Sequence, residues 1–99
     1  MSSISSIALS GINTAQTRLQ VAAHNIANLS TPDFRRQEVT QNTQADGGTR
    51  AVIGRADTIG PDLVGDLVRQ LQAKHDFLAN LSVLKTSNET LGSLLDIFA

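Results

Sequence analysis

The sequence predicts an all-α protein, in which two long terminal helices pack as an antiparallel, coiled-coil-like hairpin. Three observations support this. Small and aliphatic residues recur at helical spacing over residues 3–29, and a broad apolar stripe runs through residues 61–98. The intervening residues 30–60 show no sustained period. At 99 residues we expect one helical domain spanning 1–99, with a flexible connector in its middle.

The first predicted helix carries its apolar residues at alternating steps of three and four. Three of them, Gly11, Ala15 and Ala22, are small enough to let a neighbouring backbone come close. The sequence 30–32, Ser-Thr-Pro, ends the pattern because proline disfavours the helical conformation in the residue before it. The full predicted face consists of Ile4, Ala8, Gly11, Ala15, Leu19, Ala22 and Ile26.

The connector is rich in Gln, Asn, Thr, Gly and Arg, with a turn signal at residues 46–48, Asp-Gly-Gly. Residues 39–40 and 52–53 could pair about this turn as a short hairpin. An isolated two-stranded ribbon is marginally stable, so we expect an exposed, mobile loop instead.

The sequence Gly60-Pro61-Asp62 predicts the start of the second helix, because proline suits the first helical position and an acid is favourable near the positive end of the helix dipole. At about 1.5 Å per residue it is longer than its partner, so its last turns project beyond the first helix. In the predicted register Ile26 lies near Val64, Leu19 near Leu71 and Ile12 near Leu78. The apolar stripe comprises Val64, Leu67, Val68, Leu71, Leu78, Leu81, Leu84, Leu91, Leu94, Leu95 and Phe98.

Composition argues against several classes of function. The net charge of −1 offers no field to attract a phosphate backbone or an anionic membrane. The start has neither the basic nor the apolar region of a cleavable signal peptide, and no stretch is apolar enough to span a bilayer. Without cysteine, and with His24 and His75 as the only imidazoles, we expect no catalytic residues, no metal site and no cofactor.

Both ends of the chain carry a family resemblance. Residues 9–16, LSGINTAQ, and 23–36, AHNIANLSTPDFRR, resemble the N-terminal signature of bacterial flagellar rod and hook proteins, roughly A-N-N-I-A-N-x-x-T-x-G-[YF]-x-R. Residues 67–96 are similar to the C-terminal helix of that family. His24 and Asp33 depart from the pattern, Asp33 replacing a glycine suited to a left-handed turn. The connector is also shorter than in relatives that carry large β-rich domains there.

The resemblance implies a non-enzymatic structural subunit of the flagellar basal-body rod, which assembles through its terminal helices and serves motility. It implies export through the flagellar type III apparatus to the periplasmic rod, with other rod and hook subunits and further copies of itself as partners. The alternative is a helical-hairpin binding module, such as a type III secretion chaperone or regulator, whose apolar stripe grips a single client.

Two sets of site residues follow. The assembly interface is predicted at Gly11, Ala15, Leu19, Ile26, Leu71, Leu78, Leu91, Leu94, Leu95 and Phe98. The resemblance singles out Asn25, Ile26, Ala27, Asn28, Thr31, Phe34, Arg36, Ala79 and Asn80.

Overall fold

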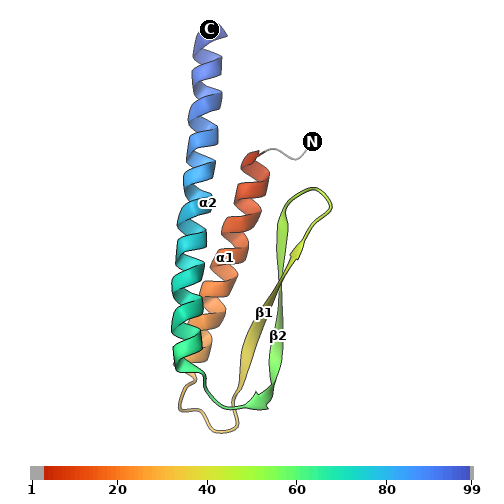
Figure 1. The fold of residues 1–99 in the computed structure, drawn as a ribbon, viewed down its shortest axis with the longest axis vertical. Helices are drawn as coiled ribbons and strands as arrows, with labels where there is room; N and C mark the ends of the chain where they lie inside the picture. The colour runs from red at the N-terminus through yellow and green to blue at the C-terminus, as the bar shows by residue number, and fades with distance from the viewer. Residues whose placement is uncertain (1–3, 99) are drawn as a thin grey trace.

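The computed structural model describes residues 4–98 and has the element order α1, β1, β2, α2. Helix α1 spans Ile4–Ala27 and helix α2 spans Leu63–Phe98, close to the predicted ranges. The helices run antiparallel, and α2 continues well past the start of α1 (Figure 1). The molecule measures 62 × 24 × 14 Å. It is therefore a rod rather than a globule.

The prediction of an all-α fold is wrong. Residues 30–60 contain strands β1, Arg35–Thr43, and β2, Thr49–Ile59, which form a two-stranded antiparallel sheet. The pairing considered for a short hairpin does occur, with Val39 opposite Ile53 and Thr40 opposite Val52, but the ribbon is much longer. It turns through Gly47, whose φ of 95° suits glycine.

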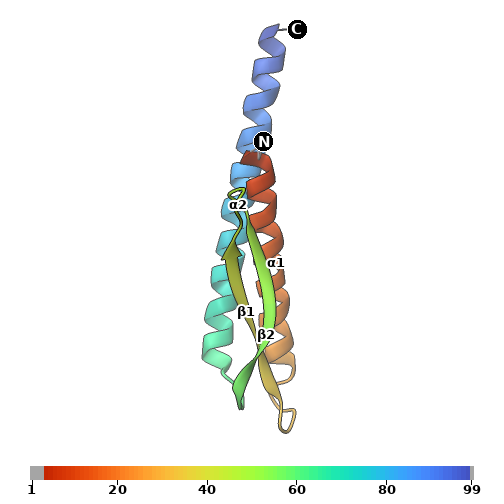
Figure 2. The ribbon, with the colours of Figure 1, turned by 90° about the vertical axis from the view of Figure 1, so that its right-hand side faces the viewer.

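The hairpin is stable because it is not an isolated ribbon. It lies along α1 on the side opposite α2, so that α1 is the middle layer (Figure 1, Figure 2). Near the turn, the Thr49 amide donates to the Ser10 hydroxyl at 3.1 Å, and the Thr14 and Thr49 hydroxyls lie 3.1 Å apart. Further along the ribbon, Ala56 is buried. Helix α1 thus supplies the second face that a lone hairpin lacks.

The position of α1 between two layers explains where the small core lies. Among the described residues, five of the seven buried apolar side chains belong to α1: Ala8, Ile12, Ala15, Val21 and Ala22. The other two are Ala56 of β2 and Ala73 of α2. Alanine dominates this set, so the layers approach closely without large side chains between them.

The helix ends follow local signals. Asp62 caps α2, since its carboxylate accepts from the Gly65 amide at 3.2 Å and its carbonyl accepts from the Asp66 amide at 2.8 Å. The hydrogen bond from Gly65, followed by that from Arg69, lowers the pKa of Asp62 below its ordinary value. After α1, Asp33 adopts a φ of 59°, the left-handed conformation expected where the family has glycine.

Candidate functional site

Asn25 joins three elements at the base of the molecule. Its side-chain amide nitrogen donates to the Gln37 carbonyl at 2.9 Å, and its oxygen accepts from the Gln37 amide at 2.8 Å. The same nitrogen lies 3.4 Å from a carboxylate oxygen of Asp66 in α2. Asn25 is buried, so its amide acts as one more strand partner for β1 and holds the hairpin to α1.

Arg36 and Asp66 form a buried ion pair beside Asn25. Two guanidinium nitrogens of Arg36 donate to the two Asp66 oxygens, one of them at 3.2 Å, and Arg69 donates to Asp66 at 3.1 Å. Asp66 is only 1% exposed, and its hydrogen bond raises the pKa of Arg36 above the ordinary value. The register of β1 and β2 shifts between Arg35 and Gln37, where three residues of β2, 56–58, lie opposite the single residue Arg36.

Arg36, which the family resemblance singles out, binds a carboxylate of its own chain. Asp66 is not among the predicted site residues. No sequence signal distinguishes it from Asp62, because its burial depends on the approach of β1 and α1.

The other motif residues close the end of α1. The Asn28 side chain donates to the His24 carbonyl at 2.9 Å and accepts from the Thr31 hydroxyl at 3.1 Å. Phe34 folds back against the helix, with its ring centre 5.5 Å from that of His24 in an edge-on arrangement. Ala27 and Ala79 are exposed. Asn25 is therefore the motif asparagine that connects elements, while Asn28 acts locally.

Gly11 permits the closest approach between the helices. A Cβ atom at Gly11 would lie 2.5 Å from the Asn80 side-chain oxygen, which is too close for any side chain. The register is close to the predicted one: Gly11 packs on Asn80, Arg18 bonds Asp76 at 2.5 Å, and Ser5 lies 3.2 Å from Ser87. The leucines expected at these positions point elsewhere.

Helix α2 turns mainly small and polar residues toward α1. Apart from Gly65 and Gly92, seven of its described residues are buried or half-buried, and they follow one another at steps of four and three. We call this set the α1-facing seam: Asp66, Gln70, Ala73, Phe77, Asn80, Leu84 and Ser87.

The predicted leucines of α2 form two uncovered surfaces. We call the first the lateral face; its members lie on one side of the helix and are 44–74% exposed: Val64, Leu67, Leu71, Leu78 and Leu81. The second is the overhang, residues 88–98, beyond the point where Ser87 meets Ser5. The apolar side chains of the overhang are 49–73% exposed: Leu91, Leu94, Leu95 and Ile97.

The predicted interface residues therefore fall into two groups. Ala15 is buried within the chain, and Gly11, Leu19 and Ile26 are half-buried, so these α1 residues pack mainly inside the molecule. The residues from α2 are exposed, namely Leu71, Leu78, Leu91, Leu94 and Leu95. The side chain of Phe98 lies outside the described residues.

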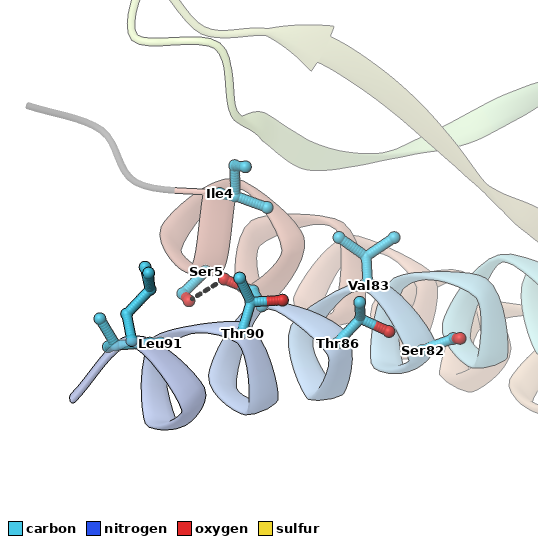
Figure 3. A pocket seen from close by; sticks show the side chains of 9 residues that line it. Ile4, Ser5, Ser82, Val83, Thr86, Thr90 and Leu91 are labelled. Carbon is cyan, nitrogen blue, oxygen red and sulfur yellow. Dashed lines mark hydrogen bonds between the residues drawn. The ribbon is translucent and has the colours of Figure 1, made fainter. Parts of the chain in front are cut away.

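A shallow groove of about 690 Å³ lies beside the first turn of α1. Ile4 and Ser5 form one wall, and Val83, Thr86 and Leu91 belong to the other. Figure 3 shows Leu91 lying past the end of α1, beyond the hydrogen bond made by Ser5. The groove is thus open toward the overhang.

An elongated helical rod with two uncovered aliphatic surfaces is typical of structural and interaction proteins. Residues 6–35 match the family model of the flagella basal body rod protein. This match covers the N-terminal part of the chain and confirms the resemblance to the rod protein family that the motif predicted. No curated protein sequence matches the chain.

The match supports a structural role related to the flagellar rod, a location in the basal body and association with other flagellar components. The family is not known as one of enzymes. Within residues 4–98, neither helix has the length and apolarity that crossing a bilayer requires.

Proposed function

We propose that this protein is a structural subunit of the flagellar rod, whose lateral face packs against helices of neighbouring rod or hook subunits, further copies included. It would reach the periplasmic rod through the flagellar type III apparatus. The rod family segment at residues 6–35 supports the location, and the geometry of α2 supports the mode of assembly.

The exposed lateral face carries the proposal. No other element within residues 4–98 covers its five aliphatic side chains, because the hairpin lies on the far side of α1. Contiguous apolar surface of this kind commonly marks contacts with other proteins. A neighbouring helix laid along this face would cover it in the manner of helix packing in bundles.

Shape and surface area agree with this. The radius of gyration is 17.3 Å, whereas a compact chain of this length has about 13 Å. The accessible surface is 6806 Å², while a compact monomer of 10.5 kDa exposes about 5,400 Å². The difference exceeds the ~800 Å² that one partner buries in a standard interface. The chain therefore exposes enough surface for a standard interface with a neighbouring protein.

The test is complementation of a deletion strain of the source bacterium, scored by swimming and by isolation of intact basal bodies. Leu71→Asp places a charge in the lateral face, where the chain's own packing does not need leucine, and we expect it to prevent assembly while secretion of the protein continues. Gln72→Asp adds the same charge at the next, exposed position and should restore swimming.

Two outcomes would count against the rod subunit. A deletion strain that swims normally excludes an essential structural role. A purified complex with a single client in one-to-one stoichiometry, closed to further growth, favours the helical-hairpin binding module instead, since a rod subunit forms open-ended or ring-like assemblies.

Leu95→Asp, in the overhang, should also impair assembly and leave export intact.

A further inference from the structure

The hairpin is attached to the helices unevenly along its length. At its base, Asn25 binds both backbone groups of Gln37, and Arg36 forms its buried ion pair with Asp66. Ala56 is buried at this end as well. The base of the hairpin is therefore fixed by buried contacts, both to α1 and to α2.

The distal hairpin, residues 39–53, is attached by much less. Within this range no apolar side chain is buried. Two hydrogen bonds to α1 meet at Thr49, whose amide donates to the Ser10 hydroxyl and whose hydroxyl lies 3.1 Å from that of Thr14. A segment with few buried apolar contacts opens locally at a lower free energy than the rest of a protein.

Open grooves run between this part of the hairpin and the helices. Three of them have volumes of about 380, 300 and 280 Å³. Each is lined by residues of both α1 and the distal hairpin: Val21 with Val39, Ala15 with Gln41, and Ser10 with Arg50. Side chains beside an open groove make fewer contacts than those in a close-packed interior. The distal hairpin therefore lies against α1 without interlocking with it.

A glycine lies where the fixed base meets the distal hairpin. Gly54 of β2 pairs with Glu38, the residue after Gln37. A Cβ atom at Gly54 would meet nothing within 4 Å, and its φ is not positive, so neither space nor backbone conformation requires glycine. Glycine in the interior of a strand weakens the strand and is common where strands bend. The pair is thus suited to be a bending point.

We propose that the distal hairpin is a flap that bends at Glu38 and Gly54 and lifts from α1 while the base stays attached. Its strands remain paired as it lifts, because their hydrogen bonds to each other do not involve α1. Opening uncovers Thr14, which is 3% exposed in the closed state, and the adjoining outer side of α1. The flap thereby controls access to a part of the rod family segment, residues 6–35. The lateral face plays no part in this, so the inference does not depend on the proposed function.

Hydrogen exchange of three amides in the full chain tests the flap. The Thr49 amide reports opening, because its partner, the Ser10 hydroxyl, belongs to α1. The Gln37 amide reports the fixed base. Because Gln37 turns its backbone groups toward Asn25, alternation turns those of Thr40 toward β2, so the Thr40 amide reports the pairing of the strands. Relative to their intrinsic rates, Thr49 should exchange at least about tenfold faster than the other two.

Three variants separate the parts of the device. Thr14→Val removes one bond of the closed state without touching the Thr49 amide or its acceptor, and it should speed exchange at Thr49 about fivefold. Thr17→Val is the matched control, because the Thr17 hydroxyl binds the Asn13 carbonyl within α1; it should leave that exchange unchanged. Gly54→Val should slow exchange at Thr49 about threefold, because a β-branched residue stiffens the bending point.

The proposal is overturned if Thr49 and Thr40 exchange equally fast in the wild-type chain, since the hairpin then unravels rather than lifts. Exchange at Thr49 as slow as at Gln37 would also overturn it, because the distal part would then be as firmly attached as the base. So would equal effects of Thr14→Val and Thr17→Val, or exchange at Thr49 that Gly54→Val leaves unchanged.

Discussion

The two asparagines of the rod motif look equivalent in sequence, yet the structure predicts very different consequences of replacing them. Asn25→Ala removes both hydrogen bonds to the Gln37 backbone, at 2.9 and 2.8 Å, and a third contact with Asp66. Asn28→Ala removes only bonds within the end of α1, to His24 and Thr31.

The magnitude follows from what each substitution leaves unpaired. At Gln37 one amide and one carbonyl lose their partner in a half-buried site, and each unsatisfied group costs about 1–2 kcal/mol, so Asn25→Ala should lower the free energy of unfolding by about 2–4 kcal/mol. The groups freed by Asn28→Ala are exposed and find water, so that change should cost about 0.5 kcal/mol.

Urea unfolding followed by far-ultraviolet circular dichroism measures the difference. Asn25→Ala should lower the urea concentration at the midpoint of unfolding by roughly 1–3 M, and Asn28→Ala should lower it by only a few tenths of that amount. Hydrogen exchange gives a local check, because the Gln37 amide should exchange about 30-fold faster or more in Asn25→Ala. Asn25→Asp should be worse than alanine, since it places a second carboxylate beside Asp66.

Equal midpoints for the two alanine variants would refute this reasoning. So would a loss of stability in Asn25→Ala without faster exchange in the hairpin, because the argument assigns Asn25 the attachment of β1 to α1.

Three further changes test the packing and the polar cluster. Gly11→Ala should lower stability by about 1–3 kcal/mol in thermal unfolding, because the Asn80 side chain must shift away from α1 and give up its hydrogen bond to the Asp76 carbonyl; Gly11→Ala combined with Asn80→Ala should recover most of the loss. Asp66→Ala should cost about 3–5 kcal/mol since it leaves Arg36 buried without a partner, whereas Asp66→Leu with Arg36→Met should cost much less in the same urea assay. The lowered pKa of Asp62 means that its cap on α2 is fully present above its ordinary pKa of 3.8 and is lost as the pH falls below it; Asp62→Asn should flatten the pH dependence of helicity in that acid range.

Local signals were sufficient for the helices and their ends. Spacing, the proline at position 32 and the Gly60-Pro61-Asp62 start predicted α1 and α2 to within a few residues, and the family pattern predicted the left-handed turn at Asp33. Helix lengths alone predicted that α2 would overhang. These features depend on residues close together in the chain.

The hairpin could not be predicted in the same way. Its strands are polar and mostly exposed, so they lack the alternating apolar pattern by which a half-buried strand is identified. Its stability comes from α1, through contacts such as those of Ser10 with Thr49 and of Asn25 with Gln37. A sequence does not show that a helix many residues away will supply them.

The sequence by itself determined that this protein has two long terminal helices of unequal length and carries the rod family motif. Only the tertiary structure decided which side of α2 faces α1. Apolar residues are spread around α2, so periodicity favoured no single side. The close contact of Gly11 with Asn80 and the bonds of Asp66 with Arg36 and Asn25 select a small and polar seam. Helix rotation is thus fixed by short-range fit and by the need to pair buried charge, and these leave the leucines facing outward.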